Sequence, residues 1–247
     1  MLGSKYRFVI FLLLTAAQNV FPQAQELPFP KGKVYSYTGF SLQYNEYFEQ
    51  ADWVAWELTA DEARGITKRK DNFRPDPNII TGSADPSDYK ASGYDRGHLA
   101  PAGDMKWSEE AMSESFLMSN ISPQEAQFNR KIWKDLEELV RQWAISNEKI
   151  LVATGPIITE GYKTIGTSKV AVPSYFFKVI ADSSEPDIKG IGFIIPNKKS
   201  TAVLQAFAFP IDYIENITGF DFFYQLDDDT ESIIESSIDI SRWSWDY

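Results

Sequence analysis

The sequence predicts an α+β fold, in which strands near both ends of the chain enclose a helical middle. Apolar and polar residues alternate near the start, an apolar stripe with helical spacing covers residues 130–145, and further apolar runs follow it. Neither an internal repeat nor a linker interrupts the 247 residues. Strands on both sides of helical segments are typical of one α+β domain, which we expect at residues 26–247.

The first 25 residues have the features of a secretory signal peptide. Lys5 and Arg7 precede ten almost wholly apolar residues at 8–17, a run too short to cross a bilayer, which needs about 20 helical residues. We therefore expect a secreted or periplasmic protein. Cleavage after Ala17 and cleavage near Ala24 both remain open.

The N-terminal elements follow from alternation and turn residues. Residues 33–37 and 40–44 predict a hairpin, and the aromatic and branched residues at 52–59 predict a buried strand. Residues 61–92 contain many glycines and prolines and predict a long surface segment, which in a compact domain is often functional. Ser108, followed by two glutamates, predicts the start of a helix over 108–119.

The C-terminal elements begin with the clearest helix, over residues 130–145. Its apolar residues recur at offsets 0, 1, 4, 7, 8, 11 and 12 from Ile132, which is a continuous helical stripe. Apolar runs predict four further strands, at 149–154, 175–181, 190–195 and 202–209. Short helices are expected at 210–217 and 229–237.

The composition excludes several kinds of chemistry. The chain has no cysteine, which excludes disulfides, thiolate nucleophiles and cysteine-ligated metals, and its single histidine, His98, excludes a site with two imidazoles. The formal net charge is −11. Residues 221–247 carry eight acids and one base, so most of the excess lies in this acidic C-terminal segment. A local basic groove elsewhere is therefore compatible with the acidic total.

The residues that suggest chemistry lie between positions 94 and 141. His98 ends the tetrapeptide DRGH, and Asn120, Asn129 and Glu137 follow it. An imidazole can accept a proton near neutral pH, and an arginine fork suits phosphate oxygens. Amide and carboxylate oxygens suit magnesium, which keeps several of its waters. These are the groups that hydrolysis of a phosphodiester requires.

This pattern resembles the DNA/RNA non-specific endonucleases, the family of the secreted bacterial sugar-non-specific nuclease and mitochondrial endonuclease G. The matching pieces are DRGH at 95–98, LMSNISPQ at 117–124, Asn129 with Trp133 and Leu136-Glu137, VATGP at 152–156 and VPSY at 172–175. Spaced matches extend from position 53 to about position 220. The resemblance implies a ββα-metal (His-Me finger) fold with a central, mostly antiparallel sheet flanked by helices.

The resemblance also implies a role for each residue. His98 would be the general base, Arg96 would face the phosphate, and Asn120 would order the site near the base. Asn129 would bind Mg²⁺, or alternatively Mn²⁺, and water would complete the coordination. Glu137 would hold those waters. The rise of about 12 Å between Asn129 and Glu137 on an ideal helix is compatible with this role, because it is too long for both residues to bind one ion directly. A metal-bound water would protonate the leaving 3′-oxygen, giving 5′-phosphate products.

One position departs from the family pattern. The family has a second phosphate-binding arginine where an ungapped match places Asp71. Arg69 and Arg74 are the candidates to replace it, within a group of five basic residues between positions 64 and 74. We favour Arg69.

These features predict a secreted, magnesium-dependent endonuclease that cuts DNA and RNA with little sequence preference. A phosphodiesterase with a narrower substrate and a non-catalytic exported nucleic-acid-binding module remain alternatives. Simpler interpretations of the same residues are a structural His98, Asn129 as a helix N-cap and a merely solvated basic loop. DNA and RNA are the expected partners, a homodimer is left open, and no membrane contact is expected after signal removal.

Overall fold

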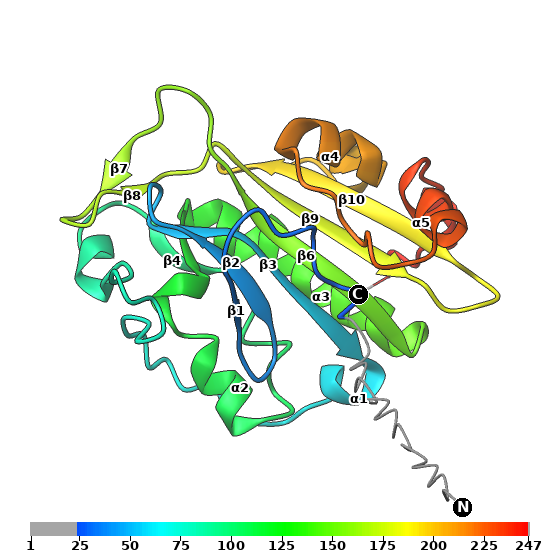
Figure 1. The fold of residues 1–247 in the computed structure, drawn as a ribbon, viewed down its shortest axis with the longest axis horizontal. Helices are drawn as coiled ribbons and strands as arrows, with labels where there is room; N and C mark the ends of the chain where they lie inside the picture. Colours follow the sequence, from blue (N-terminus) through cyan, green and yellow to red (C-terminus); the bar gives the residue numbers. More distant parts are fainter. Residues whose placement is uncertain (1–23, 247) are drawn as a thin grey trace, which may run out of the picture.

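A seven-stranded antiparallel sheet forms the centre of the computed structural model, which describes residues 24–246 (Figure 1). Most of the predicted signal peptide, up to residue 23, lies outside the described residues. The strands run in the order β1 (Val34–Ser36), β2 (Ser41–Asn45), β3 (Gln50–Thr59), β6 (Lys149–Ile157), β9 (Tyr175–Asp182), β10 (Lys189–Pro196) and β11 (Ala208–Phe209). This arrangement confirms the predicted fold class, a mostly antiparallel sheet flanked by helices.

Two small antiparallel ladders and five α-helices accompany the sheet in the described part of the chain. The ladders join β4 (Asp95–His98) to β5 (Ile121–Gln124) and β7 (Thr164–Ile165) to β8 (Val170–Ala171). The helices are α1 (Ala60–Ala63), α2 (Glu109–Glu114), α3 (Lys134–Ser146), α4 (Ile211–Thr218) and α5 (Asp228–Glu235). A search of residues 24–246 finds no helix with the length and apolar character needed to cross a membrane.

Alternation along β3 separates two apolar layers. Trp56 and Leu58 pack in the cluster that contains the apolar stripe of α3. Trp53 and Ala55 face the other way and pack in a cluster with residues of α4 and α5. Helix α3 therefore covers one face of the sheet, and α4 and α5 cover the opposite face (Figure 1).

The predicted hairpin, the buried strand β3, the α3 stripe and the strands β6, β9 and β10 are confirmed, with small shifts in their ends. The helix predicted over 108–119 ends at Glu114 and is followed by a 3₁₀ turn at Met118–Asn120. Here the backbone of Arg74 accepts from Met118 N–H and donates to Phe116 O, so long-range pairing replaces helical hydrogen bonds.

Two other segments differ from the sequence interpretation. The strand predicted over 202–209 is wrong except at β11: residues Leu204–Phe207 form a 3₁₀ turn. Leu204 packs in the α3 layer and Phe209 against the α4–α5 layer, so this segment wraps around the sheet edge. The helix predicted over 130–145 begins earlier, with a π-helical turn at Phe128–Trp133 before α3. Such wide turns often occur at functional sites, and this one contains Asn129.

Candidate active site

The β4–β5 ladder fixes the backbone around His98. His98 ends β4 and pairs with Ile121 of β5. Immediately after it, Leu99 N–H donates to the carbonyl of Asn120 at 3.0 Å. The Asn120 side chain exchanges two 2.9 Å hydrogen bonds with the backbone of Ala100 and donates a third to Ser115 O. Asn120 is fully buried, so its amide orders the loop after His98 and has no contact with the cleft described below.

Two phenylalanine rings enclose the imidazole of His98. Its centroid lies 5.4 Å from that of Phe73 and 4.9 Å from that of Phe116. The side chain is 8% exposed, and Nε2 is buried without a hydrogen-bond partner among residues 24–246. Burial, together with the positive charges of Arg69 and Arg96, lowers the pKa of His98 to about 3. The imidazole is therefore neutral at physiological pH and free to accept a proton.

A cleft of about 300 Å³ opens beside this histidine. Its lining contains five basic side chains, one carboxylate and one amide: Arg69, Arg96, Arg130, Lys134, Arg141, Glu137 and Asn129. The structure thus brings five of the seven residues singled out from the sequence to one place. The two exceptions are Asn120, which lies behind the site, and Arg74.

The two arginines that flank His98 are held by the same rings that hold the imidazole. The guanidinium of Arg96 lies 4.3 Å from the centroid of Phe73, and that of Arg69 lies 4.9 Å from the centroid of Phe116. Arg69 Nε also contacts Asp71 Oδ1 at 2.7 Å. A guanidinium over an aromatic face keeps its edge directed away from the ring, so Arg96 and the terminal nitrogens of Arg69 can donate to phosphate oxygens.

Arg74 has a different environment from Arg69. It is half-buried, and its Nη1 donates to the carbonyls of Asn72 at 3.3 Å and Ser113 at 2.8 Å. These bonds tie the loop before β4 to the end of α2, and the residue does not line the cleft. The geometry therefore favours Arg69 as the second phosphate-binding arginine.

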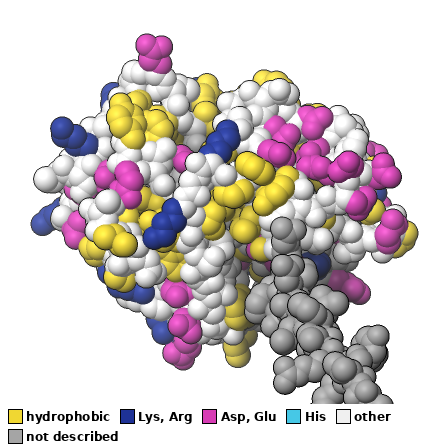
Figure 2. Space-filling view, in the orientation of Figure 1, with side chains coloured by type: hydrophobic (Ala, Val, Ile, Leu, Met, Phe, Trp, Pro, Cys, Tyr) yellow, Lys and Arg dark blue, Asp and Glu magenta, His cyan; other side chains and the backbone are white. Residues whose placement is uncertain are grey.

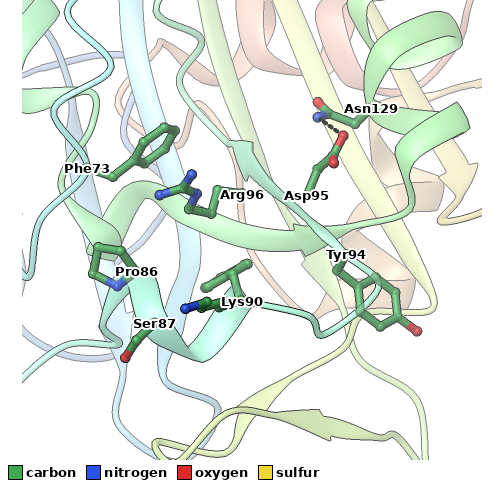
Figure 3. A pocket seen from close by; sticks show the side chains of 9 residues that line it. Phe73, Pro86, Ser87, Lys90, Tyr94, Asp95, Arg96 and Asn129 are labelled. Carbon is green, nitrogen blue, oxygen red and sulfur yellow. Dashed lines mark hydrogen bonds between the residues drawn. The ribbon is translucent and has the colours of Figure 1, made fainter.

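Asp95 orients the side chain of Asn129. Asn129 Nδ2 donates to Asp95 Oδ2 at 3.0 Å, which leaves the amide oxygen on the side away from Asp95 (Figure 3). Arg130 donates to both carboxylate oxygens of Asp95, from Nη2 to Oδ1 at 2.6 Å and from Nε to Oδ2 at 2.8 Å. Burial acts to raise the pKa of Asp95, but the hydrogen bonds from Arg130 and Asn129 outweigh it and hold the pKa below its ordinary value.

A buried charge network lies beneath Glu137. Lys178 of β9 is 1% exposed, and its Nζ lies 5.0 and 4.8 Å from the ring centroids of Trp56 and Trp133, with no hydrogen-bond partner in the described chain. Burial lowers the pKa of Lys178, which the charges of Glu137 and Asp104 oppose. Burial raises the pKa of Glu137, which Lys178 opposes.

Arg141 connects this network to the edge of the cleft. Its Nη1 bonds to the fully buried Asp104 at 2.9 Å. Burial raises the pKa of Asp104, and the charge of Arg141 opposes this rise. Arg141 lines the cleft together with Glu137, so a single carboxylate faces the cavity amid a surplus of cations.

A second hollow, of about 530 Å³, adjoins the cleft and shares Arg96 and Asn129 with it. Phe73, Lys90, Tyr94 and the 3₁₀ turn Pro86–Tyr89 form its other walls (Figure 3). The two hollows together form a groove that follows β4. This groove includes part of the surface segment expected between residues 61 and 92.

The donor set of the cleft fits a hydrated magnesium or manganese ion. The amide oxygen of Asn129 and the carboxylate of Glu137 are hard oxygen ligands, and both face the same cavity. Among the lining residues within 24–246 there is no second carboxylate, which suits an ion that keeps most of its waters. Asn129 would hold the ion, and Glu137 would accept hydrogen bonds from those waters.

Sequence reasoning missed several residues that build this site. Phe73, Phe116, Asp95 and Lys178 were not singled out, although each contacts or supports a residue that was. Asp95 could have been found because it begins the DRGH tetrapeptide. Lys178 also had a signal, as the single basic residue in the apolar run YFFKVIA. Nothing in the sequence shows that Phe73 and Phe116 meet at His98.

Comparisons with known proteins identify the family of the chain. The family model for DNA/RNA non-specific endonucleases matches residues 19–229. A nuclease of Nostoc sp. is 33% identical over 213 residues, which cover 81% of this chain and 76% of that protein. Human mitochondrial endonuclease G is 34% identical over 195 residues, covering 73% of this chain and 66% of that protein. Mouse mitochondrial nuclease EXOG is 35% identical, but the chain spans only 57% of its length.

A solved structure gives the same result at the level of the fold. The crystal structure of an EndoG/EndoGI complex, described as showing the mechanism of EndoG inhibition, contains a chain with a TM-score of 0.75 and 31% identity. The match covers 81% of this chain and 89% of that chain. The chain therefore belongs to the DNA/RNA non-specific endonuclease family, as its motifs predicted, and the protein is a nuclease of that family.

Proposed function

We propose that the protein is an exported endonuclease that hydrolyses DNA and RNA, with His98 as the general base and Mg²⁺ held by Asn129; Mn²⁺ is the alternative ion. The observation that carries this proposal is the cleft itself. A neutral imidazole, two ring-stacked arginines and an oxygen-donor pair line one cavity. These are the base, the anion-binding groups and the metal ligands that phosphodiester hydrolysis needs.

The pKa of His98 explains how the base is controlled. In the free enzyme burial and, to a smaller extent, the two arginines keep its pKa low, so the ring stays unprotonated. A substrate phosphate between Arg69 and Arg96 would neutralise much of their charge, and the pKa of His98 would rise while the substrate is bound. His98 would then accept a proton from the attacking water.

The remaining residues position the substrate and stabilise its charge. Arg96 and Arg69 would bind the phosphate oxygens, and Asp95 would keep the Asn129 amide turned toward the ion. A bound divalent ion supplies positive charge at the leaving 3′-oxygen, so the products would carry 5′-phosphates. The polar lining of the cleft is mainly cationic. Contacts from cations to phosphates carry no sequence information, which supports cleavage with little sequence preference.

Digestion of plasmid DNA and of RNA tests this proposal directly. We expect both to be degraded with MgCl₂, digestion to stop with a chelator, and His98→Ala to lose at least about a thousandfold in kcat. End analysis should show 5′-phosphates. Digestion that survives chelation contradicts the metal assignment. Cleavage of RNA alone, or of a small diester alone, would favour the narrower phosphodiesterase, and binding without cleavage the non-catalytic module.

Export and assembly are proposals of their own. The basic residues and the apolar run at 8–17 support a cleaved signal and a mature domain at 26–247. Sequencing the N-terminus of protein recovered from the periplasm or medium checks the cleavage. Sedimentation of that mature protein checks the homodimer.

A further inference from the structure

A second group of oxygen ligands lies on the sheet face opposite α3. Asp212 and Glu215 are three residues apart on α4, and Glu235 is the last residue of α5. One carboxylate oxygen from each residue lies within 4.8 Å of those of the other two. Figure 2 shows acidic side chains gathered over this side of the molecule, where α4 and α5 pack on β10.

The buried carboxylate of Glu235 distinguishes this group from ordinary surface acids. The residue is 6% exposed, and its Oε1 has no hydrogen-bond partner within residues 24–246. Buried polar atoms usually have a partner, and a cation among the three carboxylates would supply the one that this oxygen lacks.

The geometry of the group is compatible with one cation. Glu215 Oε1 accepts a 2.6 Å hydrogen bond from Phe222 N–H, which fixes its carboxylate. Asp212 is exposed, so water can reach the ion from its side. Magnesium is usually held by only one or two protein carboxylates, whereas calcium takes about six to eight oxygen ligands, so a group of three carboxylates favours calcium. Calcium also accepts several carboxylates in irregular geometry.

We propose that Asp212, Glu215 and Glu235 bind one calcium ion that joins α4 to α5. The ion would stabilise the helical layer on this face and would neutralise the charge buried with Glu235. The inference does not depend on the proposed function, because the sheet separates these residues from the cleft that contains His98. It concerns stability, so it can be tested without an activity assay.

Thermal unfolding and calorimetric titration of the chelator-treated full protein test the site. With 10 mM CaCl₂ we expect Tm to rise by about 3–8 °C, as for an extracellular site of 10⁻⁴–10⁻³ M affinity. MgCl₂ at the same concentration should give a smaller rise. Glu235→Gln should weaken calcium binding at least about tenfold and abolish the calcium-dependent shift, because it removes a carboxylate ligand.

Three further variants make the result specific. Asp212→Asn alters an exposed ligand that cannot disturb the core, and it should also reduce the shift. Glu160→Gln, an exposed residue outside the group, and Asn129→Ala, in the catalytic cleft, should retain the full shift. An equal calcium response in wild type, Glu235→Gln and Asp212→Asn overturns the proposal. Loss of the response in Asn129→Ala would place the ion in the cleft and also overturn it, as would a larger shift with MgCl₂.

Discussion

His98 illustrates how single residues create the chemistry of this cleft. Phe73 and Phe116 pack on its ring. Phe73 also contacts the guanidinium of Arg96, and Phe116 contacts that of Arg69. The same two rings therefore exclude water from the imidazole and place two positive charges near it. Both effects favour the neutral imidazole, which is the form that a general base needs.

The depressed pKa of His98 makes folding stability depend on pH. Between the unfolded pKa near 6.5 and the folded value of about 3, the unfolded chain binds a proton that the folded chain does not. The stability that this group contributes is fully present above pH 6.5. As the pH falls toward 3, the free energy of unfolding decreases by on the order of 3–5 kcal/mol. Urea unfolding of wild type and His98→Asn at pH 8 and pH 5 measures this. If wild type and His98→Asn differ in free energy of unfolding by the same amount at pH 8 and at pH 5, the imidazole is not buried in its neutral form.

Lys178 leads to a second prediction at this scale. Its charge stabilises the ionised form of Glu137, the form needed to hold the water of the metal site. In Lys178→Met we expect the acidic limb of the kcat profile to move up by about one pH unit and kcat at pH 7 to fall about tenfold, with KM unchanged. The exposed Lys163→Met is the matched control. A fall in kcat without any movement of the profile would assign Lys178 a purely structural role.

At the scale of elements, the periodic segments could be predicted and the irregular ones could not. The stripe of α3 and the alternation in β1–β3 follow from local burial patterns, which the sequence displays. The π-helical turn and the 3₁₀ turn at Leu204–Phe207 depend on partners distant in the chain. The same is true of the site: the motif contains His98 and Asn129, whereas the rings and the buried lysine are brought to them by tertiary packing.

The contact between β4 and the π-helical turn can be tested through Asp95. Asp95→Asn would weaken the hydrogen bonds that Asp95 accepts from Asn129 and from Arg130. Because the Asn129 amide would then be less well oriented, we expect the Mg²⁺ concentration for half-maximal activity to rise about 10–100-fold. Arg130→Gln should have a smaller effect, because Arg130 is exposed and the Asn129 bond remains. A wild-type magnesium requirement in Asp95→Asn would show that this hydrogen bond does not position the ligand.

For the whole molecule, the uneven distribution of charge decides how it can meet a polyanion. The chain carries a net charge of −11, yet the cleft beside His98 is surrounded by five basic side chains, while acids gather over α4 and α5 (Figure 2). Repulsion by the acidic side and attraction by the groove would both orient the approach of DNA or RNA. The substrate would therefore bind over the α3 side of the sheet.

Salt dependence measures how many phosphates this groove contacts. Each phosphate neutralised by an arginine releases counterions, so log KM should increase linearly with log salt. Arg96→Ala and Arg69→Ala should each reduce that slope by about one, because each removes a phosphate contact. Arg74→Ala is the matched control: its guanidinium bonds to backbone carbonyls outside the cleft, so the variant should lose stability and retain the wild-type slope. A reduced slope in Arg74→Ala, with a normal slope in Arg69→Ala, would identify Arg74 as the second phosphate-binding arginine.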